Sequence, residues 1–117
     1  MREIKFRAWY NDEMYEIFAM NFSDNKCVIN SPRFPFSQEV YPDDIMQYTG
    51  LKDKNGKEIY EGDICKGVYA GSDEREYKNK IVWDEFECCF TFADSPLWTW
   101  EMIEIIGNIY ENPELLK

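Results

Sequence analysis

The sequence predicts a mainly β fold, of the β-rich α+β class, in which short antiparallel strands dominate and helix is scarce. Short segments with strand-like alternation recur along the chain, and polar turns separate them. Aromatic residues make up 17% of the 117 residues, and such side chains pack well on pleated, half-buried surfaces. No long helical period separates the segments, so parallel βαβ units are not expected. We therefore expect an N-terminal hairpin and a C-terminal part shaped as a small barrel-like, SH3-like sheet or a strongly bent one.

The N-terminal hairpin is predicted from two alternating segments with a turn between them. Residues 4–9 place Ile4, Phe6 and Ala8 on one face, which indicates a strand with one buried face. Residues 11–13 are typical of a turn, and residues 14–22 are expected to form the returning strand. A short strand follows at 27–29. Residues 31–42 contain three prolines and are predicted as a loop or edge segment, and residues 42–44 as the start of a helical turn.

The C-terminal elements are predicted from regularly spaced turn signals. Asn55-Gly56 centres a polar turn over 52–57, because both residues tolerate positive φ. A second tight turn is expected at Glu61-Gly62, and a polar loop over 71–75. The remaining predicted elements are strands at 46–49, 58–60, 63–69, 78–83, 88–93, 97–102 and 104–109. Asn112-Pro113 is typical of a helix start, so a short helix is expected at 112–116.

Chain length and composition predict a single folded domain over 1–117, with a possible subdivision into 1–45 and 46–117. No linker-like composition separates these parts. The N-terminus lacks the apolar core of a signal peptide, and no apolar run approaches membrane-spanning length. The four cysteines include no CxxC motif, and the chain has no histidine to complete a zinc site. We therefore expect a cytoplasmic protein of the bacterial cell with reduced cysteines and no metal or cofactor.

The charge pattern disfavours a nucleic-acid partner. The net charge is −10, and residues 81–117 hold eight acidic residues against a single lysine. Affinity for a phosphate backbone comes largely from lysine and arginine, so most of this surface would repel it. A local basic patch stays open as an alternative, built from Arg2, Lys5, Arg7 and the lysines of 52–57.

Acidic residues occur in two patterns that could have a catalytic or metal-binding role. The segment from Asp53 to Gly56 superficially matches a calcium loop, but that alignment puts Leu51 at position one and Gly62 at position twelve, where oxygen ligands are essential. It is interpreted as a turn. Carboxylate clusters at 43–44, 84–87 and 58–63 all lie in or beside predicted turns, where solvated acids are expected. No catalytic residue is assigned, and a Mg²⁺-dependent acidic-site hydrolase remains an alternative without support.

The tryptophans are the candidate binding residues. Trp98 and Trp100 are predicted to share a strand face, with Trp83 on a nearby strand. In a small β fold such residues usually form core. If some stay exposed, they offer a peptide groove or anchors for self-association.

Three segments of the chain resemble the YopX family: MREIKFRAW at 1–9, MQYTGLKDKNGKEIYEGDI at 46–64 and EIIGNIYENPELL at 104–116. The resemblance implies a protein of phages and prophages, mostly β, with a barrel-like C-terminal part. It transfers no catalytic residues. Glu61-Gly62-Asp63 and Gly107-Asn108 are interpreted as backbone turns that define the fold.

These observations lead to one functional hypothesis and two alternatives. The leading hypothesis is a non-enzymatic module that binds a host or phage protein, or associates with itself as a homo-oligomer, through Trp98, Trp100 or Trp83. The first alternative is a small β-barrel that binds nucleic acid. The second is the acidic-site hydrolase.

Overall fold

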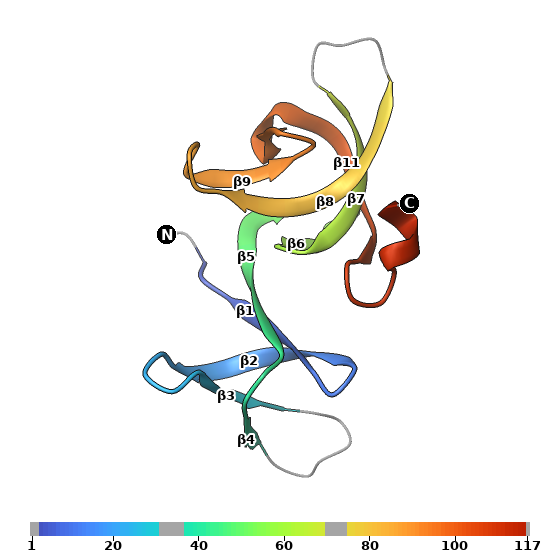
Figure 1. Ribbon diagram of the computed structural model, residues 1–117. Coiled ribbons are helices and arrows are strands. Elements are labelled where there is room, and N and C mark those ends of the chain that lie inside the picture. Colours follow the sequence, from blue (N-terminus) through green and yellow to red (C-terminus); the bar gives the residue numbers. More distant parts are fainter. Residues whose placement is uncertain (1–2, 31–36, 70–74, 117) are drawn as a thin grey trace. The chain divides into compact units, whose positions relative to one another are not determined.

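The computed structural model describes residues 3–30, 37–69 and 75–116, and strands make up most of them (Figure 1). The predicted mainly β fold is confirmed: its strands pair antiparallel in two sheets, and the helical elements described are two short 3₁₀ turns. The chain divides into two compact units, Met1–Gln47 and Tyr48–Lys117. Each unit is described separately below.

The first unit is a sheet that begins with the predicted hairpin. β1 (Phe6–Tyr10) pairs with β2 (Glu13–Asn21), and the turn between them contains Asn11 and Asp12 at positive φ. Such φ values are typical of tight hairpin turns. The sheet is completed by β3 (Lys26–Ile29), β4 (Gln38–Val40) and the first residues of β5 (Asp44–Lys52), in the order β4-β3-β2-β1-β5.

The core of the first unit lies on one face of this sheet. Its buried side chains are Ala8, Cys27, Ile29 and Val40. The alternation predicted for β1 holds at Ala8 but fails at Ile4, which precedes the strand and is 68% exposed. A side chain outside the ladder is not held to the alternating faces of the pleat, so the pattern does not extend to it.

The proline-rich segment ends in an edge strand, as expected for part of it, since β4 forms the edge of the sheet. Residues 31–36 of that prediction lie outside the described residues. The helical turn predicted at 42–44 is wrong. The Asp43 N–H donates to the Trp9 carbonyl at 2.8 Å, and β5 begins at Asp44. Pairing with β1 outcompetes the weak local preference for a turn.

The second unit is built on a curved five-stranded sheet (Figure 1). The later part of β5 pairs with β6 (Glu58–Tyr60) through Tyr48 and Lys52. The sheet itself has the order β10-β9-β8-β7-β11. Its elements are β7 (Asp63–Tyr69), β8 (Glu76–Asp84), β9 (Cys89–Phe92), β10 (Ser95–Pro96) and β11 (Trp100–Asn108). The predicted loop at 71–75 lies almost wholly outside the described residues.

The C-terminal part was expected to be barrel-like or strongly bent, and over its described residues the sheet is not closed into a barrel. Among the described residues, β10 and β11 are the two edges of the sheet and do not pair with each other. The other side of β11 is occupied by the turn after β5. The Lys54 N–H donates to the Ile103 carbonyl at 2.8 Å, and the Ile105 N–H donates to Asp53 Oδ2 at 3.1 Å. A turn thus takes the hydrogen bonds that a closing strand would need. The SH3-like arrangement stays a prediction.

The core of the second unit centres on Trp100. This residue is 9% exposed, and its ring meets three others edge to face, with centroids 5.1 Å from Tyr69, 5.3 Å from Tyr77 and 4.6 Å from Phe92. Edge-to-face contacts of this kind add to the energy of apolar burial. The same core contains Ile59, Cys65, Ile81, Phe90, Phe92, Leu97 and Ile103.

The two C-terminal strand predictions are corrected in one detail each. Residues 97–102 were expected to be a strand, but Leu97–Thr99 form the 3₁₀ turn η1, in which the Thr99 hydroxyl donates to the Pro96 carbonyl at 2.6 Å. The strand expected at 104–109 instead runs from Trp100 to Asn108. The helix expected at 112–116 is the 3₁₀ turn η2, Pro113–Leu116.

Strand β11 carries a bulge at Met102. Between the pairs Glu101↔Val68 and Glu104↔Lys66, β11 has one more residue than β7. Met102 has φ +54°, a left-handed value that is costly for a residue other than glycine. Gly67 lies between the two partners on β7, and a Cβ there would come within 2.5 Å of Ile103 Cδ1. A larger residue at position 67 would therefore require the Ile103 side chain to shift.

Replacing Gly67 by alanine is expected to destabilise the chain by about 1–3 kcal/mol, because the new methyl group overpacks the core at Ile103. Urea unfolding followed by circular dichroism measures the loss. The double variant Gly67→Ala/Ile103→Val removes the clashing Cδ1, so it should lose less than the sum of the two single variants. Additive losses would show that this clash is not the cause.

Candidate functional site

The second unit contains a hollow of about 360 Å³, within the range of ligand pockets. It is bounded by the end of β5 with its following turn, by β6, by η1 and by the start of β11. All of these elements belong to Tyr48–Lys117, so the geometry of the hollow rests on one compact unit.

Exposed apolar side chains form the rim of the hollow. Trp98 is 66% exposed, Met102 is 62% exposed and Leu51 is 40% exposed. Trp98 lies in η1, where the short turn displaces it from the strand ladder. Met102 is the bulged residue of β11, and bulges commonly redirect a side chain at a functional site. Each rim residue is therefore exposed where a regular strand is interrupted or comes to its end.

The floor of the hollow is the core itself. It is formed by Ile59, Leu97, Trp100 and Ile103, all of them buried. All four side chains are packed in the core of the second unit, so a ligand would meet a preformed apolar surface. The indole Nε1 of Trp100 is buried and has no acceptor among the described residues.

The structure separates the three predicted binding residues. Trp98 and Trp100 both line the hollow, but they do not share a strand face as predicted, because η1 ends between them and only Trp100 is buried. Trp83 does not line the hollow. It lies on β8, 45% exposed, and its ring packs edge to face on Phe90 at 5.0 Å.

The charged residues at the hollow are mostly basic. Lys52 and Lys54 are exposed in its lining. Lys54 Nζ lies 3.7 Å from Glu104 Oε1, and Lys66 Nζ lies 3.2 Å from the same oxygen. The hydrogen bond from Lys66, supported by the charge of both lysines, holds the pKa of Glu104 below its ordinary value. An anionic group in the hollow would meet lysine ammonium groups at its edge.

The one acidic residue in the lining, Asp53, is turned inward. It is 7% exposed, and its carboxylate accepts backbone N–H groups from Asn55, Lys57 and Ile105 at 2.9, 2.9 and 3.1 Å. Burial by itself would raise the pKa of Asp53, but the three donors and the Lys57 charge together hold it below its ordinary value. This carboxylate closes a turn, as the sequence predicted, and does not face a ligand.

The other predicted carboxylate clusters serve turns as well. Asp84 Oδ1 accepts the N–H groups of Phe86 and Glu87, and Asp63 Oδ2 accepts the N–H of Tyr60. Asp43 Oδ2 accepts the N–H of Asn11 at 3.3 Å. In the part of the chain that the structure describes, no three metal-ligating side chains gather at one point.

The predicted basic patch is divided between the two units. Lys5 lies in the first unit, where its Nζ is 2.6 Å from Glu3 Oε1. The lysines of 52–57 lie in the second. Arg2 is outside the described residues.

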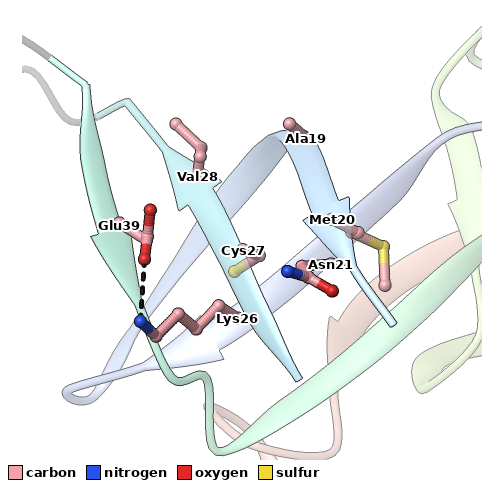
Figure 2. A pocket seen from close by; sticks show the side chains of 7 residues that line it. All are labelled: Ala19, Met20, Asn21, Lys26, Cys27, Val28 and Glu39. Atoms are coloured by element: carbon pink, nitrogen blue, oxygen red, sulfur yellow. Dashed lines mark ion pairs between the residues drawn. The ribbon is translucent and has the colours of Figure 1, made fainter. Parts of the chain in front are cut away.

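A smaller hollow of about 140 Å³ lies in the first unit, between β2, β3 and β4. Figure 2 shows its side chains, with Lys26 and Glu39 pointing toward each other. Their Nζ and Oε1 atoms are 3.0 Å apart. The buried thiol of Cys27 also lines it, and burial raises its pKa, which disfavours the thiolate. The volume is below that of typical ligand sites, and its charges already satisfy each other.

Sequence reasoning missed two rim residues, Leu51 and Met102. The only available signal was the exposure implied by a polar turn next to Leu51. The bulge at Met102 follows from pairing with β7, and no local pattern reports it.

The fold and the hollow together define a mainly β protein of two compact units with a preformed apolar site. Among the described residues, no helix is long and apolar enough to cross a membrane. Residues 5–117 match the family described as "YopX protein", and the chain belongs to that family. It is similar over its full length, and over the full length of the other chain, to the crystal structure of protein EF1440 from Enterococcus faecalis, with 32% identity and a TM-score of 0.67. No curated protein gives a significant match.

The family-like segments at 46–64 and 104–116 meet in the structure. The Ile109 N–H donates to the Gly62 carbonyl at 3.0 Å, and Asp63 pairs with Asn108 at the end of β11. Asn108 Oδ1 accepts the N–H of Tyr110 at 3.0 Å, which turns the chain after β11. A Cβ on Gly107 would lie 2.6 Å from Asn112 Oδ1. These segments therefore shape the backbone, as predicted for Glu61-Gly62-Asp63 and Gly107-Asn108.

Proposed function

We propose that the chain is a non-enzymatic protein-binding module of phage or prophage origin, acting in the cytoplasm of a bacterial cell. Its binding site is the hollow of the second unit. A single observation carries the proposal: Trp98, Met102 and Leu51 stay exposed around a preformed apolar floor. Folding alone gives no reason to expose these three side chains together, whereas docking does.

The chemistry of the lining defines the partner. The apolar floor suits a large aliphatic or aromatic side chain, and Lys52 and Lys54 suit acidic residues on either side of it. The partner is therefore a protein segment with an apolar anchor flanked by aspartate or glutamate. SH3 domains bind proline-rich peptides in aromatic-lined grooves, and we propose that this hollow likewise binds a peptide, here through an apolar side chain.

Replacing Trp98 by alanine is expected to weaken peptide binding at least about tenfold, as for a central interface tryptophan. The test is selection from a displayed peptide library on the folded protein, followed by calorimetric titration of the enriched peptides. Trp83→Ala is the matched control, because Trp83 is also exposed but does not line the hollow. The enriched peptides should carry an apolar anchor with acidic neighbours.

Two outcomes contradict the proposal. One is that selection enriches no peptide above background. The other is that Trp98→Ala and Trp83→Ala weaken the selected peptides equally, which would place the binding site elsewhere.

A further inference from the structure

The tip of the β8–β9 hairpin presents a phenylalanine to solvent. Phe86 is 100% exposed. The turn that carries it is well defined, because Asp84 Oδ1 accepts the Phe86 N–H at 2.9 Å and the Glu87 N–H at 3.1 Å. At the base of the hairpin, Trp83 packs edge to face on Phe90. The structure therefore holds a large apolar ring outward on a fixed turn, where it contributes nothing to the core.

The surroundings of Phe86 are acidic. Asp84, Glu85 and Glu87 are its neighbours in sequence, and Glu85 and Glu87 are exposed. We define the acidic knob as residues 84–87. An apolar anchor flanked by acidic residues is the partner that we propose for the hollow. Its lining carries Lys52 and also Lys54, whose Nζ lies 3.7 Å from Glu104 Oε1. The knob and the hollow are thus complementary in polarity and in charge.

Phe86 does not occupy the hollow of its own chain. The knob and the hollow belong to the same compact unit, and full exposure of the ring means that it touches no core side chain. A cavity of about 150 Å³ can bind benzene, so about 360 Å³ leaves room for a phenylalanine ring and part of its turn. The complementary surfaces can meet only between two molecules.

We propose that the acidic knob of one copy inserts Phe86 into the hollow of a second copy. This inference rests on the proposed function, and it names the occupant of the same site. The contact joins two different surfaces, so it is heterologous, and an open assembly keeps one free knob at one end and one free hollow at the other. The copies therefore form open chains or closed rings.

The test is sedimentation velocity of the full chain over a range of concentrations, with the variants Phe86→Ala and Trp98→Ala. The wild type should form species larger than dimers. Each variant alone should associate at least about tenfold more weakly. An equimolar mixture should form dimers and nothing larger, because Phe86→Ala keeps its hollow and Trp98→Ala keeps its knob. Both altered side chains are exposed, so circular dichroism should show unchanged folding.

The inference is overturned if the wild type stays monomeric at every concentration, or if Phe86→Ala associates as strongly as the wild type. Failure of this inference can be told from failure of the proposed function. If the wild type is monomeric but still selects peptides through Trp98, only self-association is refuted. If it is monomeric and selects no peptide, both self-association and the proposed function are refuted.

Discussion

Trp100→Ala is expected to destabilise the second unit by about 3–5 kcal/mol, as for large-to-small changes at buried aromatic residues. Trp100 is 9% exposed, and its ring contacts Tyr69, Tyr77 and Phe92. Removing the indole leaves a cavity among these three rings, which lose their contacts with it. Urea unfolding followed by far-ultraviolet circular dichroism measures the loss in free energy of unfolding.

Two further variants separate the causes. Trp100→Phe keeps an aromatic ring and removes an indole N–H that has no acceptor among the described residues, so it should lose less than half as much as Trp100→Ala. Trp98→Ala changes an exposed side chain two residues earlier and should stay within about 0.5 kcal/mol of the wild type. Equal losses for Trp98→Ala and Trp100→Ala would contradict the burial difference between them.

The sequence predicted the strands well where turn chemistry and alternation coincided. The strand 63–69 follows a glycine turn and matches β7, and the turn at Asn55-Gly56 has the expected positive φ at Gly56. Local preference and global pairing agree at these positions. The helical turn expected at 42–44 failed because its local signal was weak and the ladder with β1 was available.

The candidate site was predicted only in part. Trp98 and Trp100 were singled out, and both line the hollow. Their opposite burial could not be predicted, because alternation by two residues places them on one face and η1 breaks that alternation. Met102 lies at a bulge in the pairing of β11 with β7, a strand distant in the sequence. Such long-range pairing leaves no mark in the sequence around Met102.

Asp53→Ala is expected to destabilise the chain by about 3 kcal/mol or more, because it leaves three backbone N–H groups without their charged acceptor. Two of these donors belong to the turn and the third is the N–H of Ile105 in β11. The loss of stability therefore includes the hydrogen bonds within the turn and the one that attaches the turn to β11. Asp53→Asn should lose less. Its amide oxygen can still accept from Asn55 and Lys57, but its NH₂ group would then face the Ile105 N–H. Chemical denaturation at neutral pH measures both variants.

The loss of stability in Asp53→Asn should depend on pH in a defined direction. The pKa of Asp53 is lower in the folded chain than its ordinary value of about 3.9. The carboxylate therefore contributes stability that is fully present above the unfolded pKa and disappears as the pH falls through the folded pKa. The difference between the wild type and Asp53→Asn should be largest near neutral pH and shrink below about pH 4. A pH-independent difference would mean that shape, and not the ionised carboxylate, is what the turn requires. Asp53 joins the turn to β11 beside the hollow. Asp53→Asn should therefore also weaken the attachment of the segment that carries Lys52 and Lys54.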